Sequence, residues 1–202
     1  MSQLTVKLPD GSQRQYAAGT TFQDVAQSIG AGLARAALAV KANGKICDMQ
    51  VPLSEDTNLE ILTGKSPEGL EVIRHSTAHV LAMAVQKLWP GTQVTIGPVI
   101  ENGFFYDFAF PAGVKINEAD FEKIEKEMAA IVKADHPVKR RVVSREQAIA
   151  EFQALGETYK VEIIEALPAG EPITVYGMGE WFDLCRGPHV PSSGKLGAFK
   201  LT

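Results

Sequence analysis

The chain has 202 residues, of which 45% are hydrophobic and 22% are charged, so it can bury a core and has room for one large domain or two small ones. Its net charge of −4 does not favour binding a nucleic-acid backbone by bulk electrostatics, so any such contact must be local or rely on parts of a longer protein. The two cysteines, Cys47 and Cys185, form no CxxC pair, which argues against a disulfide framework and a four-cysteine zinc site. The N-terminus has no signal-peptide features, and no apolar run approaches the roughly 20 residues that span a bilayer. We therefore expect a cytoplasmic protein with no membrane contact.

Turn and alternation signals in the first third of the chain predict a hairpin, one helix and three further strands. Asn43-Gly44 is typical of a tight hairpin turn, and Thr21 with Asp24 gives a capping-box-like helix start. The expected elements are strands 4–8 and 13–16, a helix up to residue 29, and strands 38–40, 45–47 and 58–62. This order suggests a small mixed sheet that holds one helix, as in β-grasp folds. We place the domain boundary at Gly64, which gives domains 1–64 and 65–202.

The second domain begins with a long predicted helix over residues 68–89, which Pro90-Gly91 would end. Its apolar residues fall on one stripe, formed by Leu70, Ile73, Thr77, Val80, Leu81, Ala84 and Leu88. His75 and His79 fall on the opposite side, with Gln86 beside them. They are therefore expected to point at solvent or into a cleft.

The rest of the chain predicts further helices and short strands. Asn117 and Ser144 are typical helix caps, and residues 139–141 make one strand basic. The expected elements are strands 92–99 and 104–108, a helix 118–134, a strand 138–143, a helix up to 155, and short strands or loop edges at 159–164, 173–176 and 181–185. The second domain is therefore predicted to be α+β, with helices against an antiparallel sheet.

Three of the four histidines and one cysteine form two spaced pairs. His75 and His79 stand at i and i+4 on the predicted helix, and Cys185 and His189 stand four apart in a later loop. The first pair alone is best explained as solvated polar residues, whereas the four together are ligands of the kinds that zinc prefers. The remaining histidine, His136, precedes a proline in a polar turn where a surface role suffices.

Several other residues have simpler explanations that stay open. Cys185 and Arg186 could belong to a tight loop, turned by Gly187-Pro188, in which Arg186 pairs with Asp183 and the cysteine is a small hydrophobe. Tyr106 and Asp107 could be core packing with an exposed tip, and Lys160 a surface lysine. The basic run 139–141 is most simply a solvated strand face, although it could also bind phosphate.

Three strings resemble the editing domain of bacterial threonyl-tRNA synthetases. They are Ile73 to His79, Ile96-Gly97-Pro98-Val99 through Asn102-Gly103-Phe104, and Asp183-Leu184-Cys185-Arg186-Gly187-Pro188-His189-Val190-Pro191. The N-terminal part, with Leu8 to Ser12 and Val40 to Gly44, resembles the β-grasp TGS domain that precedes it in that family. The resemblance covers essentially the whole chain. Alanyl-tRNA synthetases share the HxxxH and CxxxH pairs but lack this N-terminal arrangement.

The resemblance implies a hydrolase that removes serine from mischarged tRNA(Thr). It assigns catalytic roles to His75, His79, Lys160, Asp183, Cys185 and His189, and contacts with the tRNA 3′ end to Tyr106, Asp107, Gly97, Pro98 and Arg186. Editing would require no cofactor, and zinc at the two histidine–cysteine pairs is possible but disfavoured. The partners would be the seryl-tRNA(Thr) 3′ end and the rest of the synthetase chain.

The family's class II core, with its ATP, magnesium and zinc sites, has no counterpart in these residues, so we expect a fragment that does not make threonyl-tRNA by itself. The full-length enzyme would be a homodimer. Three alternatives remain: a free-standing trans-editing deacylase, a non-catalytic tRNA-binding module, and a zinc-dependent hydrolase with another substrate.

Overall fold

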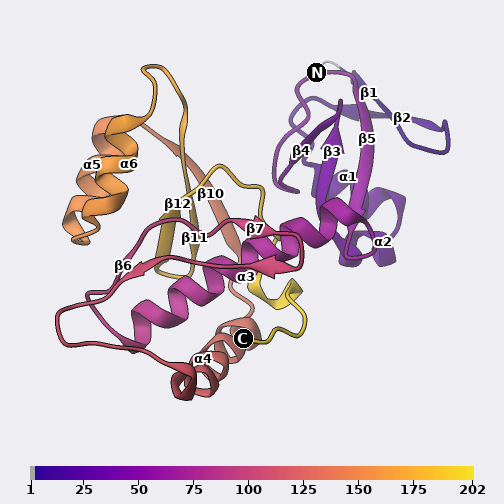
Figure 1. The fold of residues 1–202 in the computed structure, drawn as a ribbon. Helices are drawn as coiled ribbons and strands as arrows, with labels where there is room; N and C mark the ends of the chain where they lie inside the picture. Colours follow the sequence, from indigo (N-terminus) through magenta and orange to yellow (C-terminus); the bar gives the residue numbers. More distant parts are fainter. Residues whose placement is uncertain (1–2) are drawn as a thin grey trace. The chain divides into compact units, whose positions relative to one another are not determined.

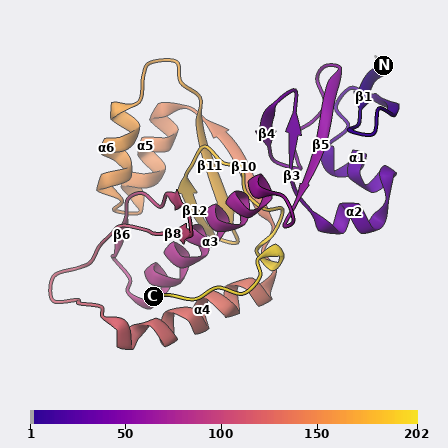
Figure 2. The same ribbon diagram turned by 45° about the vertical axis from the view of Figure 1, so that its right-hand side comes forward.

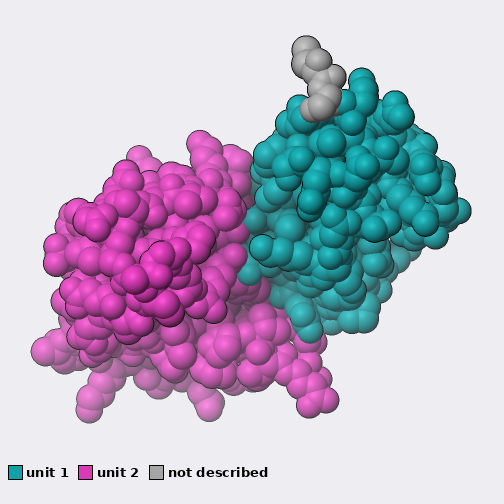
Figure 3. Space-filling model, turned by 90° about the horizontal axis from the view of Figure 1, so that it is seen from above, with its two compact units in different colours: residues 1–73, 187–191 teal, residues 74–186, 192–202 magenta. Residues whose placement is uncertain are grey.

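The computed structural model describes residues 3–202, which form two compact units. Unit 1 comprises residues up to 73 together with 187–191, and unit 2 comprises residues 74–186 and 192–202; Figure 3 colours them separately. Met1 and Ser2, with which the expected first domain begins, lie outside the described residues. The contact-based division falls inside the long helix, whereas the domain boundary expected from the sequence precedes it.

Unit 1 is a mixed five-stranded sheet with two helices (Figure 1). Its elements are β1 (Gln3–Lys7), β2 (Gln13–Ala17), α1 (Phe22–Ile29), α2 (Ala31–Ala36), β3 (Ala37–Ala42), β4 (Lys45–Cys47) and β5 (Thr57–Thr63). The strand order is β2-β1-β5-β3-β4, with β1 and β5 parallel and the other pairs antiparallel. The core of this unit lies between the sheet and α1, which contributes Phe22, Val25 and Ala26. The expected β-grasp order is confirmed.

Local signals account for most of unit 1. Asn43 and Gly44 both have positive φ, as the tight turn between β3 and β4 requires. The Thr21 side chain accepts from the backbone N–H of Asp24, and the Asp24 carboxylate accepts in return, which completes the predicted capping box. Helix α2 was not predicted. It starts directly after Gly30 in an alanine-rich segment with high helix propensity, which was the available signal.

Unit 2 is built around α3 and a three-stranded antiparallel sheet (Figures 1 and 2). Its elements are α3 (Pro67–Leu88, begun in unit 1), β6 (Gln93–Val94), β7 (Val99–Ile100), β8 (Gly103–Phe104), β9 (Phe108–Ala109), α4 (Phe121–Ala134, after a 3-10 turn Glu118–Asp120), β10 (Val138–Val143), α5 (Arg145–Ala154), α6 (Thr158–Ala166), β11 (Ile173–Met178), β12 (Trp181–Leu184) and a 3-10 turn Ser193–Lys195. The sheet order is β10-β11-β12. The expected α+β class with an antiparallel sheet is confirmed.

The two faces of this sheet carry different residues. Strand alternation turns Phe182 and Leu184 of β12 toward the core that α5 and α6 build with β11, where Phe152 and Ile164 are fully buried. Figures 1 and 2 both show α5 and α6 side by side. The other two residues of β12, Trp181 and Asp183, contact the side chains of α3 instead. The β12 strand therefore faces a helix pair on one side and α3 on the other.

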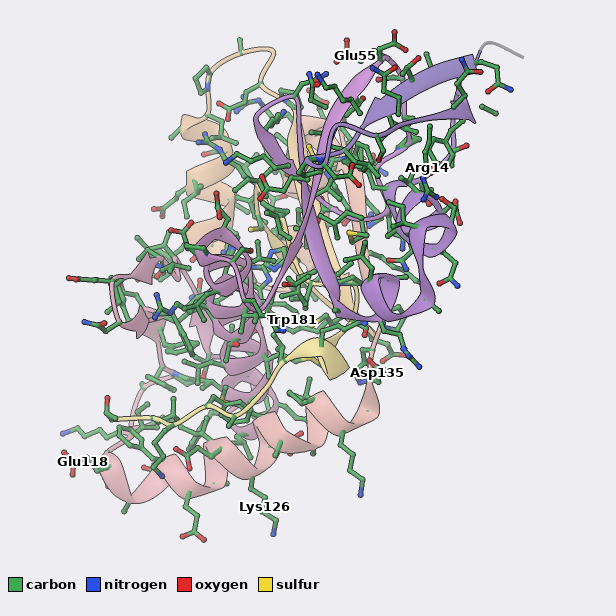
Figure 4. All side chains as sticks on the ribbon, turned by 90° about the vertical axis from the view of Figure 1, so that its right-hand side faces the viewer. Arg14, Glu55, Glu118, Lys126, Asp135 and Trp181 are labelled. Atoms are coloured by element: carbon green, nitrogen blue, oxygen red, sulfur yellow. The ribbon has the colours of Figure 1, made fainter. Side chains whose placement is uncertain are left out.

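Helix α4 follows the predicted pattern. It runs between the labelled Glu118 and Asp135 in Figure 4, and Ile124, Met128 and Ile131 on its apolar stripe are buried. The C-terminal segment runs along it, where the backbone N–H of Leu201 donates to Glu125 at 2.7 Å. Within residues 3–202, no helix is long and apolar enough to cross a membrane.

Two expectations for unit 2 are wrong. Residues 159–164 form helix α6 rather than a strand or loop edge. The predicted strands 92–99 and 104–108 are each broken, because Gly97-Pro98 interrupts the pairing and leaves two short ladders, β6–β9 and β7–β8. The side of α3 that carries His79, expected to point at solvent or into a cleft, is turned inward, with His79 4% exposed and Ala82 fully buried. The predicted apolar stripe is not buried throughout, since Leu70 is 40% exposed.

Candidate active site

Asp183 lies at the centre of a buried polar cluster in unit 2. Its side chain is 1% exposed and forms an ion pair of 2.7 Å with the ammonium group of Lys160, from α6. The hydroxyl of Tyr106, from the β8–β9 segment, donates to the second carboxylate oxygen at 2.6 Å. Lys160 and Tyr106 also approach each other to 3.4 Å. Three segments far apart in the sequence thus converge on one carboxylate, and the surface role considered for Lys160 is wrong.

His79 packs against this cluster from α3. Its Nε2 atom lies 3.9 Å from a carboxylate oxygen of Asp183, and the residue is 4% exposed. Burial lowers the pKa of His79 well below its ordinary value, and positive charge on His75 and Lys160 lowers it further. His79 is therefore neutral at physiological pH.

This neutral histidine makes folding sensitive to acid. The unfolded chain gains a proton on His79 as the pH falls through about 6.5, whereas the folded chain does not, so the free energy of unfolding should decrease as the pH falls below that value. Urea unfolding between pH 7.5 and 5 would measure this. His79→Gln should flatten the pH dependence, with His136→Gln as the matched control, and an unchanged slope in His79→Gln would contradict the expectation.

His75 and Cys185 form the more open side of the cluster. The Cys185 sulfur lies 3.1 Å from Nε2 of His75, and both residues are half-buried. The rings of His75 and His79 meet edge to face at 5.4 Å. Arg186, whose side chain is 79% exposed, pairs with Glu171 at 2.6 Å. The alternative in which Arg186 pairs with Asp183 is therefore wrong, because Lys160 and Tyr106 already occupy that carboxylate.

The broken hairpin positions Tyr106 by close packing. A Cβ atom at Gly97 would overlap the Tyr106 ring, so the ring lies directly over the glycine backbone. The Tyr106 ring also stacks on Phe108 at 5.1 Å. Burial, followed by the charge of Asp183, raises the pKa of Tyr106, which therefore stays protonated and donates to the carboxylate. Pro98 and Asp107, both predicted to contact substrate, are exposed.

His189 belongs to the short segment 187–191, whose contacts group it with unit 1. The residue is 2% exposed, and its backbone N–H donates to Asp48 at 2.9 Å. Of the two pairs that the sequence spacing singled out, His75, His79 and Cys185 lie together within unit 2.

Two further polar residues at this cluster were not predicted. Trp181 packs its ring against His79, and Glu157, at the start of α6, is 5% exposed and bonded to the side chain of Gln86. The period-two alternation of β12 was the available signal for Trp181, since it stands two residues before Asp183. Glu157 gave no signal, because its helix was expected to be a strand.

Comparison with protein families identifies both parts of the chain. Residues 4–63 match the TGS domain, and residues 173–202 match the threonyl and alanyl tRNA synthetase second additional domain. The first match lies within unit 1, and the second begins at β11 and includes Asp183, Cys185 and His189.

Curated relatives are similar along nearly the whole chain. The threonine–tRNA ligase of Acidithiobacillus ferrooxidans (strain ATCC 53993 / BNL-5-31) is 57% identical over 196 residues, which is 97% of this chain and 30% of that protein. Those of Hyphomonas neptunium and Burkholderia multivorans are 56% and 54% identical over 98% of this chain, and the match covers 30% and 31% of the relatives. The chain thus spans about three tenths of the length of the relatives it matches.

Proposed function

We propose, on the premise that this chain is the N-terminal region of a threonine–tRNA ligase, that its second domain hydrolyses the ester of tRNA(Thr) mischarged with serine. The observation that carries this proposal is the buried Lys160–Asp183–Tyr106 cluster, which adjoins two histidines and a thiol within a domain of the editing family. A buried ion pair beside the neutral His79, with His75 on the open side of the cluster, offers both fixed charge and a proton acceptor. These are the groups that ester hydrolysis by water requires.

The chemistry of the two amino acids explains the need for such an activity. Serine is threonine without one methyl group, and a methyl in a binding pocket is worth only about 1–3 kcal/mol. That difference is too small for accurate synthesis, so a second hydrolytic site that rejects threonine by a clash with its methyl increases accuracy.

In the proposed reaction, the oxygen of a water molecule attacks the carbonyl carbon of the seryl ester while His75 takes the water proton. His75 suits this role because it lies on the open side of the cluster, whereas His79 is buried and neutral. The bond to the ribose oxygen then breaks, and that oxygen receives a proton. Lys160 stabilises the negative charge that develops on the carbonyl oxygen, and Asp183 holds Lys160 and Tyr106 in place.

The exposed residues around the cluster would contact the tRNA 3′ end. Asp107 and Pro98 are exposed and follow Tyr106 and Gly97 directly in the chain, and Arg186 carries its charge at the surface beside Cys185. We propose that these side chains receive the terminal adenosine, with Gly97 acting through Tyr106. The engagement of Asp183 with Lys160 and Tyr106 favours an orienting role for this carboxylate.

A zinc-dependent hydrolase is the second candidate, because His75, His79 and Cys185 lie together in unit 2 and are donors of the kinds that zinc prefers. Bound there, zinc would supply an activated water. We propose that hydrolysis proceeds without it, since the ammonium of Lys160 near His79 raises the cost of placing a dication at the same position.

Deacylation measured under single-turnover conditions tests the proposal. The chain should release serine from seryl-tRNA(Thr) and leave threonyl-tRNA(Thr) largely intact. The rate should survive a chelator and fall steeply in His75→Ala. Equal release of both amino acids would contradict the selective site. Loss on chelation with recovery on zinc addition would favour the zinc enzyme, and tRNA binding without hydrolysis would favour a non-catalytic module.

The remaining expectations concern the whole protein. We propose that the rest of the synthetase chain and tRNA(Thr) are the partners, that the full-length enzyme is a cytoplasmic homodimer, and that ATP, magnesium and zinc act in its aminoacylation core. Release of serine by the chain alone would leave the trans-editing alternative open. A gene that continues into the synthetase core would count against that alternative.

A further inference from the structure

The indole ring of Trp181 packs against the ring of His79. The two rings meet edge to face, with centroids 5.5 Å apart and planes at 81°. His75 meets the same histidine ring edge to face at 5.4 Å, and Asp183 approaches its Nε2 atom. Because Trp181 and Asp183 stand two apart on β12, the strand presents both to α3. The orientation of the His79 ring thus depends on the orientation of the indole.

A chain of hydrogen bonds that starts at the indole N–H fixes the orientation of Trp181. The indole N–H donates to the side-chain oxygen of Gln86 at 2.7 Å. The amide nitrogen of Gln86 donates to a carboxylate oxygen of Glu157 and to the Thr92 carbonyl, at 2.8 Å for the latter. The second oxygen of Glu157 accepts from the backbone N–H of Val94 at 3.0 Å. These bonds fix both ends of the Gln86 amide, so only one orientation of the amide serves the indole.

Packing alone does not hold the indole. A cavity of about 150 Å³ lies against Trp181, Gln86 and Glu157, with Phe152 and Phe182 among its other walls. A side chain that borders unfilled space can rotate into it when its hydrogen bond is lost. The Gln86 bond is therefore the main restraint on the indole.

From these contacts we infer that Trp181 is a positioning residue for His79, and that Gln86 and Glu157 hold Trp181 in the orientation that the proposed hydrolysis needs. This inference rests on the proposed function for its catalytic consequence. Its structural part, the coupling of the indole to the histidine ring, stands independently of any activity.

Gln86→Met tests the inference because methionine has a similar volume and makes neither hydrogen bond. We expect kcat for seryl-tRNA(Thr) hydrolysis to fall roughly tenfold, with KM changed less than about twofold: a displaced His79 ring shifts His75, which it meets edge to face and which activates the water, while the substrate contacts remain. Gln147→Met, an exposed position on α5, is the matched control and should keep the wild-type rate. Trp181→Phe keeps a ring but loses the donor, and serves as the milder variant if Gln86→Met does not fold.

An NMR measurement separates the inference from the proposed function. The chain has two tryptophans, and Trp181→Phe identifies the indole N–H signal of Trp181. In the wild type this proton should exchange slowly and the indole should show cross-peaks to His79; Gln86→Met should remove both effects. Retained cross-peaks in Gln86→Met would overturn the positioning role. An unchanged kcat, or a rise in KM alone, would overturn its catalytic consequence. Absence of hydrolysis in the wild type, with the NMR effects as expected, would instead contradict the proposed function.

Discussion

Replacing Lys160 with methionine is expected to lower the free energy of unfolding by about 3–5 kcal/mol. The substitution removes one partner of an ion pair whose side chains are only 3% and 1% exposed. Tyr106 and the Leu184 N–H would remain as donors to the buried Asp183 carboxylate. The cost is mainly that of the uncompensated carboxylate, because a buried charge without its counter-ion is far less stable than the pair.

A double-mutant cycle measures this coupling. Lys160→Met and Asp183→Leu should each destabilise strongly, and the double variant should be less destabilised than the sum of the two. Lys139→Met, at an exposed position of β10, is the matched control and should change stability little. Trp89 and Trp181 both lie in unit 2, so tryptophan fluorescence during urea unfolding reports on this unit. Additive effects in the cycle would contradict a coupled pair.

Lys160→Met should also abolish most of the proposed hydrolysis. At a temperature where the variant is folded, we expect the rate for seryl-tRNA(Thr) to fall by about 100-fold or more, the usual effect of losing a group that stabilises charge in the transition state. Threonyl-tRNA(Thr), which the wild type should leave largely intact, provides the background rate. A folded variant that retains the wild-type rate would remove Lys160 from the proposed mechanism.

Gly97→Ala is expected to destabilise unit 2 by about 1–3 kcal/mol, the usual cost of forcing extra volume into a packed site. The added methyl would overlap the ring of Tyr106, which has Phe108 stacked on it. The tyrosine must therefore shift, and its hydroxyl then leaves the carboxylate of Asp183. Hydrolysis of seryl-tRNA(Thr) should fall at least about tenfold, which corresponds to 1.4 kcal/mol of transition-state stabilisation.

Gly103→Ala, in the same hairpin, is the matched control. A Cβ atom there meets nothing within 4 Å, so this variant should keep both the stability and the rate of the wild type. Thermal unfolding and single-turnover deacylation compare the two alanine variants directly. Equal stability and equal rates for the two variants would show that the contact between Gly97 and Tyr106 contributes to neither.

Local signals predicted those parts of the fold that short segments determine. The Asn43-Gly44 turn and the Ser144 cap of α5 are fixed by residues within a few positions of each other. Helix α6 could not be read this way, because its segment Val161 to Ile164 contains β-branched residues that also suit a strand. Tertiary contacts stabilise the helix instead: the guanidinium of Arg145 donates to backbone carbonyls at its C-terminal end, including that of Leu167 at 2.8 Å.

The candidate site likewise contains residues that the sequence predicts and residues whose role depends on tertiary contacts. Spacing alone picked out His75 with His79 and Cys185 with His189, because both pairs are close in sequence. The partners of Asp183 could not be read from spacing, since Tyr106 and Lys160 come from a broken hairpin and a helix that were both predicted as strands. The role of Gln86 was equally hidden: its position beside the histidines on α3 was predicted, but its hydrogen bond with Trp181 depends on the sheet.

The four residues of β12 impose a strict limit on length variation in this domain. Trp181 and Asp183 point to α3, while Phe182 and Leu184 fill the core under α5 and α6. Inserting or deleting one residue within the strand would exchange the two faces, burying a carboxylate among apolar side chains and presenting a phenylalanine to His79. The turn between β11 and β12, at Gly179, is not part of the alternating strand, so a change in its length does not exchange the two faces. Viable length changes should therefore collect in the turn, and β12 itself should accept no single-residue insertion or deletion.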